Sequence, residues 1–286
     1  MKVYRSATEL QRACTMARGA GASVGFVPTM GALHAGHLSL VESLAPAPGS
    51  FRVVSIFVNP LQFGAGEDLE EYPRPIERDL ELCREHGVDA VFTPGHGELY
   101  PEGFQTSVRV GGLTDILEGE RRPGHFDGVT TVVAKLLSIV GPCRAVFGRK
   151  DYQQLAVVRK MVSDLNMQVC IAEHPIVREL DGLALSSRNR YLSPEERQRA
   201  LCLSQGIRAA RDLWAKGERE TVLLEEAAMV PVRAGADRVD YVTVRDALTL
   251  ERVPSFSDSE PVLLLAAFVG KTRLIDNSVL CAADYS

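Results

Sequence analysis

The sequence lacks three features that mark large classes of proteins: paired cysteines, long apolar runs and an excess of positive charge. Its 6 cysteines form no C-x-x-C pair and have no regular spacing, which is typical of free thiols in a reducing compartment. The longest apolar run, residues 262–269, is far too short to span a bilayer. The start of the chain lacks the apolar core of a signal peptide. We therefore expect a cytoplasmic protein with no membrane partner.

The charge balance also excludes an electrostatic surface for nucleic acid, because the formal net charge is −5. An anionic ligand must then bind to positive groups that are gathered locally at its site. No His, Cys and carboxylate cluster has the spacing of a zinc site, so no protein-bound metal is predicted. With 286 residues, of which 45% are hydrophobic, the chain is long enough for one or two domains with sizeable cores.

The order of apolar segments predicts an α/β sheet. Short β-branched runs lie at residues 24–28, 52–58, 90–93, 145–147 and 168–172. Helical patterns separate several of them: Ile76, Leu80 and Cys83 share one side of a helix, and a second helix from Asp151 is expected to extend its apolar side to Leu165. Strands that alternate with helices imply parallel pairing, and nearly continuous apolar strands imply cover on both faces. The prediction is a Rossmann-like doubly wound parallel sheet.

The pattern changes near residue 175. Residues 193–196 read as a capping box that opens one long helix through Trp214. Strands then follow without alternating helices, at residues 239–245, 262–269 and 272–276. We expect domains at residues 1–175 and 176–286, the second being a smaller α+β domain.

The segment from Pro28 to His37 carries an H-x-G-H string directly after the first strand. His34 and His37 are three residues apart, so they share a face in a first helical turn and can approach one phosphate group. Gly31 and Gly36 allow the backbone close to a ligand, and a helix N-terminus adds N–H donors. Two ordinary helical histidines are the alternative reading of this string alone.

Polar segments follow the first four predicted strands at equivalent positions, beginning after Val27, Val58, Phe92 and Phe147. In open parallel sheets, ligands bind outside the carboxyl ends of the strands. We therefore expect these segments to converge on one crevice.

A second group of donors is spread over two further segments. Ser186, Ser187 and Arg188 are consecutive donors for phosphate oxygens, although such a string can also be a polar turn. Lys150 follows a strand, where a lysine is often only solvated. Together with the two histidines, these residues form a set that could neutralise a triphosphate during attack at the α-phosphorus.

Five segments in this order resemble the pantothenate synthetase (pantoate–β-alanine ligase) family of the H-x-G-H nucleotidyltransferase superfamily. They are PTMGALHAGH, FVNPLQFG, RPGHFDGV, FGRKDYQQL and LALSSRNRYL, and the resemblance covers essentially the whole chain. One departure is Arg149, where the family usually has Glu. The resemblance implies a cytoplasmic homodimer. A hinge near residues 175–177 is expected to let the C-terminal domain close over ATP.

The resemblance also implies a reaction in two steps at one site. The carboxylate of (R)-pantoate attacks the α-phosphorus of Mg-ATP, giving pantoyl adenylate and pyrophosphate. The amine of β-alanine then attacks the acyl carbon and releases AMP and pantothenate. Adenylation supplies a good leaving group, so two easier steps replace a difficult one.

Roles carry over where residues match the family. His37, His34, Lys150 and Arg188 are expected to be catalytic, and Gln62 and Gln154 to hold pantoate. The expected ATP-binding residues are Met30, Gly31, Ala32, Leu33, His34, Ala35, Gly36, His37, Gly148, Arg149, Lys150, Asp151, Val177, Leu185, Ser186, Ser187 and Arg188. An apolar wall around pantoate is expected from Tyr72, Val129, Val132, Val133 and Phe147. Arg122 and His125 fall near the site without an assigned role, and magnesium is expected to arrive with ATP.

Two other functions remain open at this point. A related H-x-G-H nucleotidyltransferase could act on another small acid or a phosphate, but the two glutamines suit an anionic phosphate acceptor poorly. A nucleotide-binding regulatory protein would not need His34, His37, Lys150 and Arg188 together.

Overall fold

The computed structural model describes residues 1–44, 49–64, 66–257 and 259–281. The chain divides into two compact units. The first unit comprises Met1–Gly148 and Gln153–His174, and the second comprises Arg149–Tyr152 and Pro175–Ser286.

The first unit is built on a six-stranded sheet in the order β1-β4-β3-β2-β5-β6. Its strands are β1 (Lys2–Tyr4), β2 (Ser23–Thr29), β3 (Ser50–Ile56), β4 (Ala90–Phe92), β5 (Cys143–Gly148) and β6 (Val169–His174). Every pairing is parallel, which confirms the predicted sheet. The sequence reading missed β1, because three residues with only Tyr4 buried are too few to show a period.

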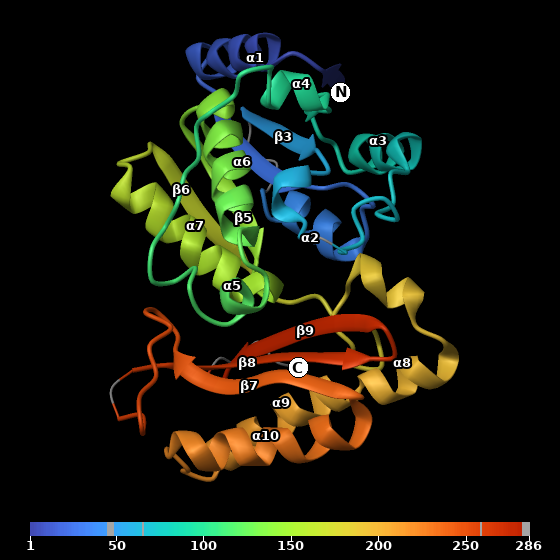
Figure 1. Cartoon of the computed structure of the whole chain (residues 1–286). Coiled ribbons are helices and arrows are strands. Elements are labelled where there is room, and N and C mark those ends of the chain that lie inside the picture. Colours follow the sequence, from blue (N-terminus) through green and yellow to red (C-terminus); the bar gives the residue numbers. More distant parts are fainter. Residues whose placement is uncertain (45–48, 65, 258, 282–286) are drawn as a thin grey trace. The chain divides into compact units, whose positions relative to one another are not determined.

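Helices cover both faces of this sheet (Figure 1). They are α1 (Ala7–Gly19), α2 (Ala35–Ser43), α3 (Ile76–Glu85), α4 (His96–Leu99), α5 (Glu118–Arg121), α6 (His125–Val140) and α7 (Tyr152–Asp164), with a short 3₁₀ helix η1 (Pro60–Gln62). Alternate residues of β3 show the two faces: Val53 belongs to the core cluster that contains residues of α1, α6 and α7, whereas Val54 belongs to the cluster that contains residues of α2 and α3. Burial on both faces explains the unbroken apolar strand.

The order of the strands reverses between β2 and β5. From β2 the chain adds β3 and then β4 on one side, while β5 and β6 lie on the other side. In such sheets ligands bind at the carboxyl ends beside this switch point. The H-x-G-H string follows β2, and Gly148 ends β5, so two of the predicted ATP segments begin at the switch.

The helix α7 ends one residue earlier than predicted. Leu165 lies beyond its last residue, Asp164, and is 54% exposed rather than packed on the apolar side. The prediction for Leu165 is wrong although its N–H still bonds to the Met161 carbonyl at 3.0 Å, because the helix ends here and Asn166 turns the chain with a φ of 49°.

The second unit carries a three-stranded antiparallel sheet, which confirms the smaller α+β part of the prediction. Its elements are η2 (Arg149–Asp151), η3 (Ser187–Tyr191), α8 (Pro194–Ala200), α9 (Cys202–Ala215), α10 (Thr221–Gly235), β7 (Arg238–Asp246), β8 (Pro261–Val269) and β9 (Thr272–Val279). Figure 1 shows α9 and α10 along one face of the sheet, where Leu203, Ile207 and Leu224 meet Leu263 and Leu265 in one core.

The predicted single helix after residue 193 is two helices. Leu201 separates α8 from α9, and its N–H bonds to the Gln198 carbonyl three residues back instead of four. A single turn with an i→i+3 bond leaves the spacing of the apolar residues unchanged. The sequence pattern therefore does not show the break between α8 and α9.

Within the described ranges, each helix is too short or too polar to cross a membrane.

The capping box at Ser193 makes a testable contribution to stability. The Ser193 hydroxyl accepts from the Glu196 N–H at 3.2 Å, and the Glu196 carboxylate accepts from the Ser193 N–H at 2.8 Å. Ser193→Ala should lower the free energy of unfolding of the second unit by ~1 kcal/mol. Urea unfolding followed by fluorescence of Trp214, the single tryptophan, measures this change.

Glu220 provides the matched control, since it precedes α10 without a side-chain capping bond. Glu220→Ala should change stability by less than about 0.5 kcal/mol. Equal losses in the two variants would contradict a specific role for the capping box.

Candidate active site

The H-x-G-H string forms a tight loop followed by a helix N-terminus. Strand β2 ends at Thr29, Gly31 and Ala32 take left-handed conformations with φ of 88° and 50°, and His34 is the N-cap of α2. A Cβ on Gly31 would lie 2.9 Å from both the Asp79 carboxylate and Ile56. Position 31 therefore requires glycine for both its conformation and its space.

Asp79 of α3 holds this loop in place. Its two carboxylate oxygens accept from the N–H groups of Ala32 and Leu33, each at 2.8 Å, and the residue is 1% exposed. Burial raises the pKa of Asp79, although both N–H donors favour its charged form. Sequence reasoning missed Asp79, because it lies on the buried side of a charged helix far from the string that it supports.

His34 and His37 lie against each other, as the spacing predicted, with ring centroids 4.1 Å apart. The Nδ1 of His34 accepts from the Gly36 N–H at 3.2 Å, and the Nδ1 of His37 accepts from the His34 N–H at 3.4 Å. These bonds assign the proton of each neutral ring to Nε2. Two imidazole donors thus stand at the N-terminus of α2, where the helix dipole also favours an anion.

Gln62 lies beside the same loop at the end of η1. Its amide nitrogen lies 3.1 Å from the Met30 sulfur, and its amide oxygen accepts from Asn59 at 3.1 Å. Asn59 also donates to the Gly128 carbonyl at 3.1 Å. A Cβ on Gly128 would lie 2.2 Å from the Leu61 carbonyl oxygen, so glycine is needed for α6 to pack on η1. The structure therefore joins a predicted pantoate residue to the predicted ATP loop.

Arg122 and His125 fix the backbone of Gln62. The guanidinium of Arg122 binds both oxygens of Glu67, at 2.7 and 2.6 Å, and donates to the Nε2 of His125 at 3.1 Å. His125 must then carry its proton on Nδ1, which donates to the Gln62 carbonyl at 2.8 Å. The two residues that the sequence left without a role hold Gln62 in place.

Charge and burial tune this network. Burial, together with the positive charge of Arg122, lowers the pKa of His125 to about 4. Burial opposes ionisation of Glu67, but the bonds and charge of Arg122 hold the pKa of that carboxyl below its usual value. His125 is therefore neutral and Glu67 ionised near pH 7.

The two glutamines at the start of α7 have different surroundings. Gln153 is 4% exposed, accepts from the Glu118 N–H at 3.0 Å and donates to the Leu113 and Ile116 carbonyls at 2.7 and 2.8 Å. Gln154 is half-buried and makes no side-chain hydrogen bond within the described part of the chain. Gln153 is thus structural, and Gln154 has its amide available for a ligand.

The residues predicted for the apolar wall are all buried in the first unit. Each of them is at most 6% exposed: Tyr72, Val129, Val132, Val133 and Phe147. Burial fits both an apolar wall and plain core packing, so their contact with a ligand stays a prediction.

The second unit holds the remaining predicted ATP residues in two segments. Arg149, Lys150 and Asp151 form η2, in which Lys150 Nζ lies 3.7 Å from an Asp151 oxygen. Val177 and Leu185 face each other across a short hairpin, with the Leu185 N–H bonded to the Val177 carbonyl at 3.0 Å. Ser186 caps η3 by accepting from the Arg188 N–H at 3.2 Å, and Ser187 is its first residue.

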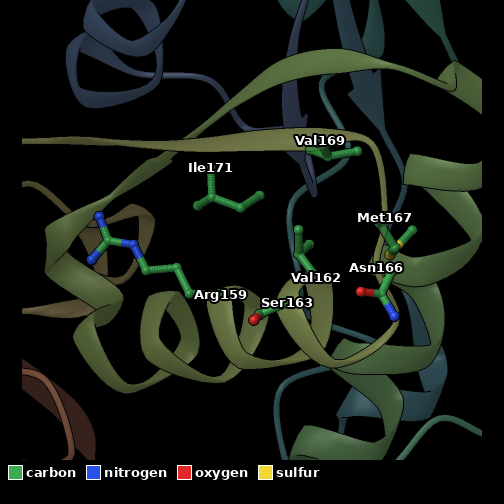
Figure 2. A pocket seen from close by; sticks show the side chains of 7 residues that line it. All are labelled: Arg159, Val162, Ser163, Asn166, Met167, Val169 and Ile171. Atoms are coloured by element: carbon green, nitrogen blue, oxygen red, sulfur yellow. The ribbon is translucent and has the colours of Figure 1, made fainter.

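A pocket of about 500 Å³ lies elsewhere, along the C-terminal half of α7 and strand β6 (Figure 2). It is lined by Arg159, Val162, Ser163, Asn166, Met167, Val169 and Ile171. None of these residues belongs to the predicted site, and Gln154 lies at the other end of α7. Among the described residues, no group of three or more His, Cys, Asp or Glu side chains is arranged to hold a metal ion.

The lowered pKa of His125 predicts a pH-dependent stability. Between pH 6.5 and about 4 the unfolded chain binds a proton at His125 that the folded chain does not, so stability must fall as pH drops through this window. The loss attributable to His125 reaches at most about 3 kcal/mol. His125→Gln, which cannot titrate, should flatten the fall when urea unfolding is compared at pH 7 and pH 4.5. The same pH slope in both proteins would remove His125 as its cause.

Comparison with known proteins shows to which family this chain belongs. The family model described as pantoate-beta-alanine ligase matches residues 2–279. The pantothenate synthetase of Pelobacter propionicus is 50% identical over 281 residues, covering 98% of each chain. The pantothenate synthetase of Moorella thermoacetica is 50% identical over 285 residues, covering 99% of this chain and all of its own.

Solved structures agree with the sequence matches. Pantothenate synthetase from Thermus thermophilus superposes with a TM-score of 0.89 at 46% identity, over 98% of this chain and 99% of the other. Pantoate-beta-alanine ligase from Francisella tularensis, complexed with beta-gamma ATP and beta-alanine, gives a TM-score of 0.79 at 31% identity over the full length of both. This chain therefore belongs to the pantoate-beta-alanine ligase family.

Proposed function

We propose that this protein condenses (R)-pantoate with β-alanine at the expense of ATP, through a pantoyl adenylate, releasing AMP and pyrophosphate. Membership of the ligase family supports the reaction, with relatives about 50% identical over nearly the whole chain. The Francisella ligase was solved with beta-gamma ATP and beta-alanine, which supports these two ligands.

One observation carries the proposal within this chain. The imidazoles of His34 and His37 stand at the N-terminus of α2, and Met30 of the same loop contacts the Gln62 amide. A phosphate-binding helix end thus lies beside an uncharged amide donor. This pairing suits the transfer of a nucleotide to a carboxylate substrate.

In the first step a carboxylate oxygen of pantoate attacks the α-phosphorus of ATP, and the bond to the bridging oxygen breaks as pyrophosphate leaves. We assign pantoate to Gln62 and Gln154. Negative charge that develops on the phosphates is stabilised by four side chains, with His37 as the main donor: His34, His37, Lys150 and Arg188. Stabilising this charge with oriented donors is the largest contribution that such a site makes.

Binding of ATP is shared among backbone and side-chain groups of both units. We assign it to residues 30–37 and Gly148 of the first unit, and to Arg149, Lys150, Asp151, Val177 and residues 185–188 of the second. Arg149 stands where the family usually has Glu, and its own backbone carbonyl is fixed by Asn277 at 2.9 Å.

In the second step the amine of β-alanine attacks the acyl carbon of the adenylate, the bond to the phosphate oxygen breaks, and AMP leaves. The amine loses its proton as the amide forms. The task of the protein is to orient the two reactants and to keep the adenylate from water.

Five further properties belong to the proposal. Mg²⁺ arrives bound to the ATP phosphates, because this ion prefers phosphate oxygens and retained waters to an all-protein cage. The protein works as a homodimer in the cytoplasm. Its domains are residues 1–175 and 176–286, and the second closes over bound ATP.

A related H-x-G-H nucleotidyltransferase acting on another small acid or a phosphate is the alternative, and the family match does not favour it. A pyrophosphate-release assay separates the two. ATP with pantoate should release pyrophosphate, and addition of β-alanine should give AMP and pantothenate in equal amounts. Pyrophosphate formed without pantoate, or no AMP after both substrates, would contradict the ligase.

The role of His37 is tested by His37→Ala, which should lower kcat by roughly 10²–10³, as for loss of one transition-state donor. His96→Ala is the control, since His96 is an exposed histidine at the start of α4 whose ring packs on Tyr100. Turnover of the His37 variant within twofold of the control would refute the assignment.

A further inference from the structure

Both segments assigned to ATP in the second unit are held by one dipeptide of strand β9. The side-chain amide of Asn277 donates to the carbonyl oxygens of Arg149 at 2.9 Å and of Lys150 at 2.8 Å. Asn277 is 3% exposed, so water does not compete for these bonds. Both amide hydrogens are used, and they fix the orientation of two successive peptide groups beside Lys150.

The preceding residue, Asp276, holds the other segment. Its carboxylate binds the guanidinium of Arg178 through two bonds of 2.7 and 2.9 Å, and Asp276 is also 3% exposed. Paired, planar contacts of this kind define position as well as supply energy. One Asp276 oxygen accepts in addition from the backbone N–H of Asn277 at 2.8 Å, which ties the Asp276 side chain to the backbone of the next residue.

Arg178 carries this restraint into the hairpin that leads to Ser186 and Arg188. It donates to the Gly182 carbonyl at 3.1 Å and pairs as an isolated bridge with Ala184. Its neighbour Val177 accepts from the Leu185 N–H at 3.0 Å. A displacement of Arg178 would therefore move residues 185–188 together with Val177.

The position of β9 explains how two adjacent residues reach two segments. This strand is at the edge of its sheet, next to β8 alone, so its outer side is open to partners. Successive side chains of a strand point to opposite faces. Asp276 and Asn277 can thus each engage a different segment from consecutive positions.

We infer that Asp276 and Asn277 are positioning residues for ATP. They fix the position of the Arg149–Asp151 segment relative to the hairpin of residues 177–185. This inference rests on the proposed ATP-dependent function. Neither side chain is assigned contact with ATP, and each acts through the backbone or through Arg178. The pair therefore controls the binding of ATP and not that of pantoate, which is assigned to residues of the first unit.

Asn277→Asp tests the inference with almost no change in shape, because it replaces the donating NH₂ by an oxygen that faces two carbonyl oxygens. KM for ATP should rise about tenfold or more, in line with the loss of two buried hydrogen bonds. KM for pantoate should stay within twofold of the wild-type value. Asp276→Asn, which removes the charge that holds Arg178, should raise KM for ATP several-fold with the same selectivity.

Ser278→Ala is the matched control in the same strand. Ser278 is 7% exposed and accepts from Arg211 at 3.0 Å, away from both ATP segments. Its KM for ATP should equal that of the wild type. Calorimetric measurement of ATP binding to the wild type and the variants distinguishes a failure of this inference from a failure of the proposed function. Absence of ATP binding by the wild-type protein would refute the proposed function itself.

Two outcomes would overturn the inference while the function stands. One is unchanged ATP affinity in both variants, and the other is an equal rise in KM for ATP and for pantoate, which a general loss of structure produces. Asn277→Ser, whose hydroxyl keeps one donor, is measured in the same way if Asn277→Asp does not fold. A selective rise in KM for ATP supports the inference, and an unchanged or unselective KM overturns it.

Discussion

The reversal of strand order between β2 and β5 is the constraint on which the site depends. Neighbouring parallel strands present their carboxyl ends on one edge, and at the reversal the following segments leave in different directions. The H-x-G-H loop leaves β2 there, and Gly148 ends β5 there. The sheet thus determines where a nucleotide can bind, and the loops supply the groups that contact it.

The groups assigned to ligands are held in place by polar side chains that have no assigned ligand contact, of which Asp79 is buried and Arg122 and His125 are half-buried. Asp79 fixes the loop before His34, and Arg122 and His125 fix the backbone of Gln62. Rigid support of this kind matters because small displacements of reacting groups cost rate. The support is long-range in sequence, so each unit must be folded before its site residues are aligned.

The sequence predicted the sheet, the place of His34 and His37 at the start of a helix, and the smaller second part, since these depend on local periodicity, strand alternation and capping. His34 itself is the extended N-cap, and only His37 lies within the helix. It missed β1, the break at Leu201 and the exposure of Leu165, because short strands and single tight turns leave no period. It also left Asp79, Asn59 and Asn277 unmarked. Each of them bonds to backbone groups tens of residues away, and no spacing rule connects such groups.

The bond between Asp79 and the H-x-G-H loop has a consequence for how the chain acquires its shape. The carboxylate and its two N–H partners are 46 and 47 residues apart, with β3 and the whole of η1 between them. Closing so long a loop has an entropic cost that must be met before the contact forms. A nascent chain that ends before α3 therefore has the histidines but lacks the carboxylate that shapes the loop before them. The shape of the nucleotide loop thus depends on a helix that is synthesised after β3, and not on the loop sequence alone.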